Sequence, residues 1–370
     1  MKAIVIGAGP SGLASAACLT REGVEVEILE RSDRIGMSWH GHYERLHLHT
    51  VRGRSGLPYR AMPKSYGRYP SRAEMIAYLK DYAAAFGLAP RFGCSVEAVR
   101  PVERGWAVAH SGGEDRAEVV VFATGLNGVP NRPDWPGLEA FGGTVLHSSD
   151  YATADRFAGQ RVLVVGFGNS GGDIALDLVE AGAAVTVSVR SAVNILPKEL
   201  FGIPITSMGG LRKVLPYKLA DALTAPVFRA KIGRPEDYGM RSADKGPAAQ
   251  VIEDGQVPLI DVGALPAIKA GKIGVAPGVE RFEPGAVVFE GDARREFDAV
   301  ILATGYRVDL RSVLGEVPGA LDAEGRPLVS GAPAAVSGLY FCSYKASADG
   351  QLRQSGIEAR AIAAEVLKAV

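Results

Sequence analysis

Apolar runs and helical stretches alternate along the first half of the chain. Residues 2–6 form an apolar run of the strand type, residues 13–22 form an alanine-rich helical stretch, and residues 24–29 form a second strand. The same order of strand, helix and strand recurs over residues 160–189. Strands that alternate with helices predict βαβ units built on a parallel sheet. The sequence therefore predicts an α/β fold with two Rossmann-like dinucleotide-binding domains.

Two more apolar strands resemble each other, because residues 119–125 and 299–305 both end in Ala-Thr-Gly. Small residues at a strand end allow another part of the backbone to approach closely. Between them, residues 194–258 contain short helical pieces interrupted by prolines, which predict a helical insertion that covers a cleft. The predicted domains are a discontinuous first domain, residues 1–155 and 290–370, and a second domain inserted into it, residues 156–289.

The amino-acid composition limits the classes of partner that we expect this protein to bind. The 370 residues include 41 Lys and Arg and 41 Asp and Glu, so no net charge favours nucleic acid or an anionic membrane. The cysteines Cys18, Cys94 and Cys342 lie far apart and form no CxxC motif, which argues against a disulfide framework or a zinc site. The N-terminus lacks the long apolar region of a signal peptide, and the sequence has no run of about 18 apolar residues. We therefore expect a soluble cytoplasmic enzyme with no nucleic-acid or membrane partner.

The loop Gly7-x-Gly9-x-x-Gly12 joins the first strand to the first helix. Gly7 permits a tight turn, Gly9 lets a phosphate approach the backbone, and Gly12 lets the helix and the strand pack closely. The start of the helix adds unpaired N–H groups and the positive end of the helix dipole. Glu30, at the end of the second strand, is placed to accept hydrogen bonds from ribose hydroxyls. Because a carboxylate suits an unphosphorylated ribose, we expect the first domain to bind FAD.

The loop Gly166-x-Gly168-x-x-Gly171 has the same context but a different strand end, where Arg190 replaces the acidic residue. A carboxylate at this place would repel a 2′-phosphate, whereas a guanidinium pairs with the phosphate and stacks on adenine. Ser191 adds a hydroxyl contact. The second domain is therefore predicted to bind NADPH in preference to NADH.

Two groups of polar residues have less specific patterns. Four histidines cluster within residues 40–49, but their spacing matches no usual zinc motif, and we expect no metal site. Asp173 and Asp177 lie four residues apart on the helix after the second loop. We expect them to be solvated or capping residues rather than an acid–base pair.

A more specific pattern lies just before the second Gly loop. Phe141, Gly143, His147 and Tyr151 match the pattern FxGxxxHxxxY. This pattern resembles the signature of class B flavin-containing monooxygenases. Tyr151 at its last position resembles the N-oxygenating and YUCCA-type branches, whereas Baeyer–Villiger enzymes usually carry Trp there.

The resemblance extends over nearly the whole chain and is closest to the YUCCA group of plant auxin synthesis, the indole-3-pyruvate monooxygenases. Any one of its motifs alone would be weak, but together they are specific. They lie at residues 43–49, 69–72, 135–138, 168–175, 190–197, 258–263 and 302–306.

The resemblance implies an NADPH-dependent FAD monooxygenase. NADPH would reduce FAD, O2 would add at flavin C4a to form a (hydro)peroxyflavin, and this species would oxygenate a small organic substrate. The implied substrate is a 2-oxo acid such as indole-3-pyruvate, or a soft nitrogen or sulfur nucleophile. The alternative is an NADPH:acceptor flavoprotein reductase that does not oxygenate; the lack of a cysteine pair argues only against a disulfide reductase. A homodimer is the expected assembly on general grounds.

The resemblance also assigns individual residues. His49 aligns with a position near the flavin edge, where an imidazole donates a hydrogen bond to the flavin peroxide; a packed loop histidine is the alternative. His147 resembles the linker histidine of the signature, which is expected to tie the two domains together during nucleotide binding. Gly36 and Trp39 resemble the GGxW turn beside the flavin, with Met37 in place of the second Gly.

The predicted cofactor-binding residues lie mostly in the loops at strand ends. The complete set is Gly7, Gly9, Pro10, Ser11, Gly12, Glu30, Arg31, Gly36, Trp39, Val96, Ala123, Thr124, Gly125, Gly166, Gly168, Asn169, Ser170, Gly171, Arg190, Ser191, Ala303, Thr304, Gly305 and Leu352.

Overall fold

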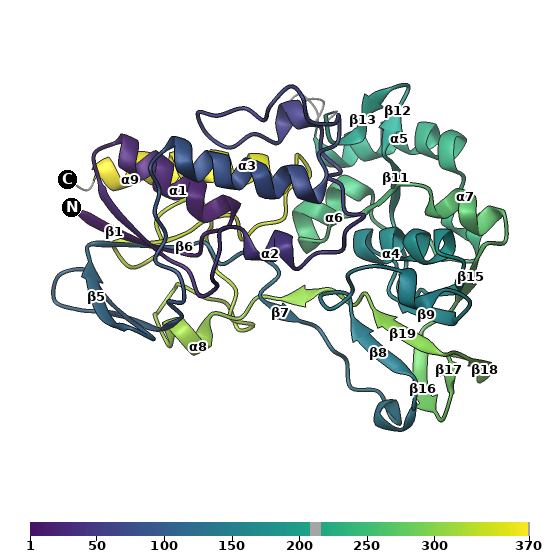
Figure 1. Cartoon of the computed structure of the whole chain (residues 1–370). Helices are drawn as coiled ribbons and strands as arrows, with labels where there is room; N and C mark the ends of the chain where they lie inside the picture. Colours follow the sequence, from purple (N-terminus) through teal and green to yellow (C-terminus); the bar gives the residue numbers. More distant parts are fainter. Residues whose placement is uncertain (208–215, 369–370) are drawn as a thin grey trace. The chain divides into compact units, whose positions relative to one another are not determined.

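The computed structural model describes residues 1–207 and 216–368, which form two compact units. Each unit combines segments that are distant in the sequence, so several colours of the chain meet within one unit (Figure 1). Unit 1 comprises Met1–His40, Thr50–Val129 and Tyr306–Val370, and unit 2 comprises Gly41–His49 and Pro130–Gly305.

A four-stranded parallel sheet forms the centre of unit 1, with strand order β2-β1-β6-β21. The bounds are β1 Lys2–Ile6, β2 Glu25–Leu29, β6 Val119–Phe122 and β21 Leu339–Phe341. β1 and β6 are continuous apolar runs that are almost fully buried, as in parallel strands covered on both faces. Because the strands are parallel, their carboxyl ends meet at one edge, where the first Gly loop begins.

Three long helices belong to unit 1, namely α1 Pro10–Arg21, α3 Arg72–Ala85 and α9 Gln351–Lys368. α1 packs against both α9 and α3 (Figure 1). It begins with Pro10, whose fixed φ and missing N–H suit the first turn of a helix. α3 begins with a capping box, in which Ser71 N–H donates to Glu74 Oε2 at 2.7 Å and Glu74 N–H donates to Ser71 Oγ at 3.2 Å.

The other elements of unit 1 are short. They are α2 Met37–His40, the 3-10 helix η1 Arg52–Arg54, the antiparallel strands β3 Val96–Pro101, β4 Trp106–His110 and β5 Gly113–Ala117, and α8 Arg311–Leu314. The short strands β7 Val129–Pro130 and β20 Tyr306–Arg307 lie where the chain passes between the units. A core of buried apolar side chains, among them Ile4, Trp106 and Phe341, joins the β3–β5 sheet to the main sheet.

A five-stranded parallel sheet forms the centre of unit 2, with strand order β15-β10-β9-β19-β8. The bounds are β8 Thr144–His147, β9 Arg161–Val165, β10 Ala184–Ser188, β15 Ile273–Ala276 and β19 Ala299–Leu302. The helices α4 Asn169–Glu180 and α7 Ala264–Lys269 pack together beside this sheet (Figure 1). The antiparallel strands β16 Val279–Glu283, β17 Ala286–Phe289 and β18 Ala293–Glu296 complete the framework, with the 3-10 helices η2 Leu138–Ala140 and η3 Asp155–Phe157.

The insertion predicted to be helical is mixed. It contains α5 Tyr217–Ile232, η5 Pro235–Tyr238 and α6 Pro247–Asp254, but also β11 Ile195–Pro197, β12 Glu199–Leu200 and β13 Ile203–Pro204. β12 and β13 form a hairpin, and β11 pairs in parallel with β14 Leu259–Asp261. The proline pattern did not predict β11, because its partner strand lies about sixty residues further along the chain. Residues 208–215, part of the predicted insertion, lie outside the described residues.

The fold class is confirmed, because each unit is a Rossmann-like α/β assembly around a parallel sheet. The compact units differ from the predicted domains at three places, one of which is Gly41–His49 in unit 2. Residues 130–155 and 290–305 lie in unit 2 because β8 and β19 pair in the sheet that contains β9. No helix in the described part of the chain is both long and apolar enough to cross a membrane.

Candidate functional site

Each glycine of the first Gly loop has a separate steric role. Gly7 has a φ of +107°, and a Cβ atom there would lie 2.8 Å from the carbonyl oxygen of Ala123. A Cβ on Gly12 would lie 1.8 Å from the carbonyl oxygen of Gly7. Around Gly9, in contrast, no atom lies within 4 Å of the Cβ position. The first and third glycines are therefore required for packing, and the space above the second is open for a phosphate.

The second Gly loop, in unit 2, has the same steric arrangement. Gly166 has a φ of +101°, and its Cβ would lie 2.5 Å from the carbonyl oxygen of Ala303. A Cβ on Gly171 would lie 2.1 Å from the carbonyl oxygen of Gly166, and the space at Gly168 is open. Ala303 therefore lies against the second loop as Ala123 lies against the first. Both loops fit a dinucleotide pyrophosphate at the start of their helix.

Glu30 lies at the end of β2 and is buried. Its Oε2 accepts a hydrogen bond from the backbone N–H of Ala8 at 2.7 Å, and its Oε1 accepts one from Ser32 N–H at 2.9 Å. A carboxylate has about four acceptor positions, so capacity remains for ribose hydroxyls. Gly36 borders the same loop, because its N–H donates to the carbonyl of Ala8 at 3.0 Å.

A buried network of hydroxyl groups lies behind the first loop, and the sequence pattern did not predict it. Ser11, in the first turn of α1, is 3.0 Å from the hydroxyl of Ser355 in α9, which is 2.9 Å from that of Ser343. The buried carboxylate of Glu358 holds this region, because Oε2 accepts from Ser343 N–H at 2.5 Å and from Ser330 Oγ at 2.6 Å. Ser343 has a φ of +70°, which is unusual for a residue other than glycine, so several contacts must hold it in place.

The other residues predicted for the first site are less closely grouped. Thr124 lies beside Tyr344, whose hydroxyl is 2.6 Å from Thr124 Oγ1; burial raises the pKa of Tyr344 to about 12, so this hydroxyl stays protonated. Leu352 is buried at the start of α9. Trp39 is half-buried and its carbonyl accepts from Arg72, whereas Arg31 is exposed. Val96, in β3, packs against the core of unit 1.

At the second site, the residues after the strand are exposed, whereas the side chain of Asn169 in the loop is hydrogen-bonded to the backbone. Arg190 and Ser191 follow β10 and are exposed, and the carbonyl of Arg190 accepts from the guanidinium of Arg241. The side chain of Asn169, which the sequence assigned to NADPH, is instead bonded to the backbone of β14 and its flank. Its Oδ1 accepts from Ile260 N–H at 2.8 Å and its Nδ2 donates to the Pro258 carbonyl at 3.3 Å. Asn169 thus ties the start of α4 to β14.

His147 is fully buried at the end of β8. Its Nδ1 accepts from the backbone N–H of Ser149 at 3.1 Å, so Nε2 carries the proton and donates to the carbonyl of Gly305 at 3.1 Å. Burial lowers the pKa of this imidazole. Within unit 2, His147 therefore fastens β8 to the Ala-Thr-Gly turn after β19, where Thr304 Oγ1 donates to the carbonyl of Asn131 at 2.5 Å.

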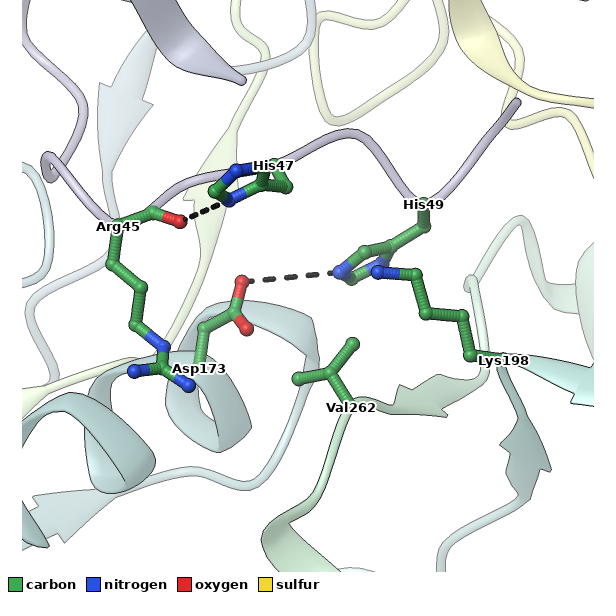
Figure 2. Close-up of a pocket in the computed structure, with 6 residues that line it drawn as sticks. All are labelled: Arg45, His47, His49, Asp173, Lys198 and Val262. Atoms are coloured by element: carbon green, nitrogen blue, oxygen red, sulfur yellow. Dashed lines mark hydrogen bonds and ion pairs between the residues drawn. The ribbon is translucent and has the colours of Figure 1, made fainter. Parts of the chain in front are cut away.

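A cavity of about 340 Å³ lies within unit 2, close to the start of α4 (Figure 2). Its walls come from four separate parts of the sequence. It is lined by Arg45, His47, His49, Asp173, Lys198 and Val262.

The strand pairing explains why two of these residues are neighbours. Pro197 is paired with Asp261 at the end of β11 and β14, so Lys198 and Val262 leave the two strands side by side. Because Asn169 ties α4 to β14, Asp173 near the start of α4 is held near them. Burial lowers the pKa of Lys198, and the carboxylates of Asp173 and Glu199 oppose this effect.

The segment Gly41–His49 forms the remaining wall. Its backbone is held by Glu44 N–H, which donates to the carbonyl of Ala152 at 3.0 Å, and Arg45 pairs with Glu180. His47 Nδ1 donates to the carbonyl of Arg45 at 2.7 Å. His49 Nε2 is buried, lies 3.8 Å from Asp173 Oδ2, and makes no hydrogen bond within the described part of the chain. Among the described residues, no three His, Cys, Asp or Glu side chains are grouped to hold a metal ion.

The expectation that Asp173 and Asp177 are solvated or capping residues is wrong. Asp173 is buried and its Oδ2 accepts from the hydroxyl of Tyr43 at 3.0 Å. Asp177 accepts from the hydroxyl of Tyr151 at 2.6 Å, and burial raises the pKa of this tyrosine. Their partners lie far away in the sequence, so helical spacing alone could not reveal them.

The chain is similar to proteins of known activity. Residues 4–197 match the pyridine nucleotide-disulphide oxidoreductase family. The chain is 40% identical to indole-3-pyruvate monooxygenase YUCCA1 of Oryza sativa subsp. japonica over 328 residues, which cover 87% of this chain and 81% of the rice protein. It is also 40% identical to the probable indole-3-pyruvate monooxygenase YUCCA3 of Arabidopsis thaliana, over 84% of this chain and 74% of that protein.

Among solved structures, a flavin-containing monooxygenase from Stenotrophomonas maltophilia superposes with a TM-score of 0.75 at 26% identity, covering 100% of this chain and 98% of that one. The prediction of an oxidoreductase that uses FAD and NADPH is confirmed. The chain belongs to the flavin-containing monooxygenases, in the family that includes the YUCCA indole-3-pyruvate monooxygenases.

Proposed function

We propose that this monooxygenase acts on a small 2-oxo acid and converts it oxidatively to the carboxylic acid that is one carbon shorter. The overall reaction is R-CH2-CO-COOH + O2 + NADPH + H⁺ → R-CH2-COOH + CO2 + H2O + NADP⁺. One atom of O2 enters the acid and the other leaves as water. The observation that carries this proposal is the cavity of unit 2, in which a lysine and a histidine face a space suited to a small molecule. The identity to relatives named indole-3-pyruvate monooxygenases also supports it.

The chain's own residues would hold the two nucleotides at the Gly loops. When bound, FAD accepts hydride from NADPH and supplies the chemistry that activates O2. The open space at Gly9 and Gly168 admits the pyrophosphates, and Glu30 accepts hydrogen bonds from the ribose of FAD. Arg190, exposed at its strand end, pairs with the 2′-phosphate of NADPH.

The residues of the cavity would orient the substrate. His49 keeps a buried Nε2 that has no hydrogen-bond partner in the described chain, so it is available for a hydrogen bond to a bound reactant. Asp173 stands 3.8 Å from this nitrogen and helps to orient the ring. His147 affects the site only indirectly, because both of its ring nitrogens are hydrogen-bonded to the backbone of unit 2.

The test is the stoichiometry of turnover with ¹⁸O2. Purified holoenzyme, NADPH and indole-3-pyruvate should yield one labelled indole-3-acetic acid and one CO2 for each NADPH consumed. A thioether such as methyl phenyl sulfide serves as the competing substrate class. NADPH consumption with equivalent hydrogen peroxide and no labelled product from either substrate would favour a reductase and refute the proposal.

We further propose a homodimer in the cytoplasm as the working state of the enzyme. The balanced charge of the chain and the frequency of twofold assemblies support this proposal. Light scattering of the holoenzyme at micromolar concentration should give twice the chain mass of 38.9 kDa. A single chain mass at that concentration would contradict the dimer.

A further inference from the structure

One carboxylate oxygen in the cavity of unit 2 faces two side chains that can donate hydrogen bonds to it. Asp173 Oδ2 accepts a hydrogen bond from the hydroxyl of Tyr43 at 3.0 Å. The same oxygen lies 3.8 Å from Nε2 of His49, which is too far for a hydrogen bond (Figure 2). His49 Nε2 is shielded from solvent and has no hydrogen-bond partner within the described chain. The tyrosine therefore holds a carboxylate that the histidine approaches but does not bond.

Tyr43 has little freedom to leave this position. Its side chain is buried and packs edge-on against the ring of Tyr151, with the ring centroids 6.3 Å apart. Tyr151 in turn donates a hydrogen bond to Asp177 at 2.6 Å, one helical turn after Asp173 in α4. Two buried tyrosines thus lie along one face of this helix, each with its hydroxyl on a carboxylate.

The backbone that leads to His49 follows the same helix. Glu44 N–H donates to the carbonyl of Ala152 at 3.0 Å, and Arg45 pairs with Glu180 at the end of α4. With this backbone held beside α4, a small movement of the carboxylate decides whether it bonds the imidazole. A shift of about 1 Å would be enough, since hydrogen bonds between a charged donor and a carboxylate are about 2.7–2.9 Å long.

We propose that Tyr43 is a positioning residue that keeps His49 available to the reactant by holding the Asp173 carboxylate away from the imidazole. A buried carboxylate that loses its donor is unfavourable, so its side chain would turn to the next donor within reach. A carboxylate bonded to His49 would fix the proton on Nε2 and withdraw this nitrogen from the reactant. The inference rests on the role proposed above for His49, but it does not depend on which substrate the enzyme accepts.

Removal of the Tyr43 hydroxyl tests this role with a signal that is independent of turnover. The chain contains six histidines, few enough to assign in a holoenzyme labelled with ¹⁵N-histidine. Tyr43→Phe should add a ring N–H proton resonance that is shifted downfield and exchanges slowly, because His49 has become bonded to Asp173. His49→Gln in the Tyr43→Phe background identifies this resonance by its loss. In Tyr43→Phe/Asp173→Asn, where a neutral amide replaces the carboxylate, the resonance should also disappear.

Turnover should follow the same order, measured with whichever of indole-3-pyruvate and methyl phenyl sulfide gives labelled product. In Tyr43→Phe the kcat for product should fall by about 10- to 100-fold, since a charge-assisted hydrogen bond would capture most of the imidazole. The NADPH concentration that half-saturates anaerobic flavin reduction should change by about twofold or less, because the Gly loop is untouched. The added Asp173→Asn substitution should recover about threefold or more of the lost kcat, since it removes the captor.

The matched control is Tyr151→Phe, which removes the equivalent hydrogen bond one turn further along α4. Asp177 is not among the described residues that line the cavity. Tyr151→Phe should therefore lower the melting temperature about as much as Tyr43→Phe does, but it should add no downfield resonance.

Three outcomes would overturn the inference. If Tyr43→Phe lost kcat without a new resonance, the tyrosine would act by packing, or the carboxylate would have turned to Lys198 instead. A new resonance with an unchanged kcat would show that capture of His49 does not affect turnover. A double variant no faster than Tyr43→Phe would show that the loss has another cause. Failure of the proposed function looks different, because the wild type would then give no labelled product while the resonance still appeared in Tyr43→Phe.

Discussion

The open space at Gly168 and the closed space at Gly171 predict opposite effects for the same substitution. At Gly168 the backbone has φ −93° and ψ −168°, which any L-residue adopts, and no atom lies within 4 Å of an added Cβ. Gly168→Ala should therefore fold, with a loss of about 1 kcal/mol or less at the N-cap. At Gly171 an added Cβ would lie 2.1 Å from a backbone carbonyl oxygen, which has little freedom to move.

The magnitudes follow from these contacts. In Gly168→Ala the methyl group occupies the space proposed for the pyrophosphate, so one or two charge-assisted hydrogen bonds to loop N–H groups are lost, about 1.5–4 kcal/mol. That loss corresponds to an increase of about 10- to 1,000-fold in the NADPH dissociation constant. In Gly171→Ala the clash should reduce the free energy of unfolding by about 3 kcal/mol or more. For a unit of this size the melting temperature would fall by about 6–12 °C.

Two measurements on the same preparations separate these effects. Anaerobic flavin reduction at increasing NADPH concentration gives the half-saturation value, and thermal unfolding gives the melting temperature. Gly9→Ala is the matched control, because it has the same open geometry but should weaken FAD and not NADPH. If Gly168→Ala kept the wild-type half-saturation within twofold, the phosphates would not lie over this glycine and the steric reasoning would be refuted.

Three further substitutions address the remaining parts of the site. Arg190→Ala should raise the KM for NADPH by about 10- to 100-fold with little change for NADH, and equal effects in steady-state kinetics would remove the 2′-phosphate assignment. Because burial lowers the pKa of His147 below its ordinary 6.5, the unfolded chain binds the extra proton first, and the folded state should lose stability as the pH falls below about 6.5. His147→Gln, which can still donate to the Gly305 carbonyl, should flatten this slope in melting curves between pH 8 and pH 5.5. Glu358→Gln should lower the free energy of unfolding by about 2–4 kcal/mol, because its new amide group would face the N–H of Ser343. Urea titrations measure this change, and a loss of less than about 0.5 kcal/mol would contradict the buried network.

The parts of the enzyme that sequence analysis predicted well are those set by local spacing. The Gly loops, their strands and the residues at the strand ends lie within about twenty-five residues of each other, so their geometry is contained in the spacing itself. Gly7 and Ala123 show the limit of this argument. The close approach of the Ala123 carbonyl, just after β6, explains why residue 7 is a glycine, and the sequence pattern indicated a close approach without identifying what approached.

The cavity could not be predicted in the same way, because it depends on contacts between distant segments. Asp173 is held by Tyr43, which lies 130 residues earlier, and Lys198 takes its place through the pairing of β11 with β14. Asn169 was assigned to the nucleotide from its place in the loop, but its amide is bonded to the backbone at Ile260 and Pro258. A sequence pattern lists the donors and acceptors of a loop, but the tertiary contacts decide which of them remain free.

The βαβ units with a Gly loop occur twice in the chain, whereas the segments that line the cavity occur once. These two kinds of segment therefore have different functions. The two Gly loops are sterically equivalent, and we propose that the choice between FAD and NADPH depends on the strand ends, where a buried Glu30 and an exposed Arg190 differ in charge and accessibility. The cavity takes Asp173 from a repeated βαβ unit, but its other lining residues come from Gly41–His49 and from the segments around β11 and β14. These segments have no counterpart in the first unit's βαβ repeat, and within the described part of the chain only β14 and its flank are hydrogen-bonded to the side chain of Asn169 in the second Gly loop. Relatives that share both Gly loops but act on other substrates should therefore differ from this chain within residues 41–49 and around β11 and β14.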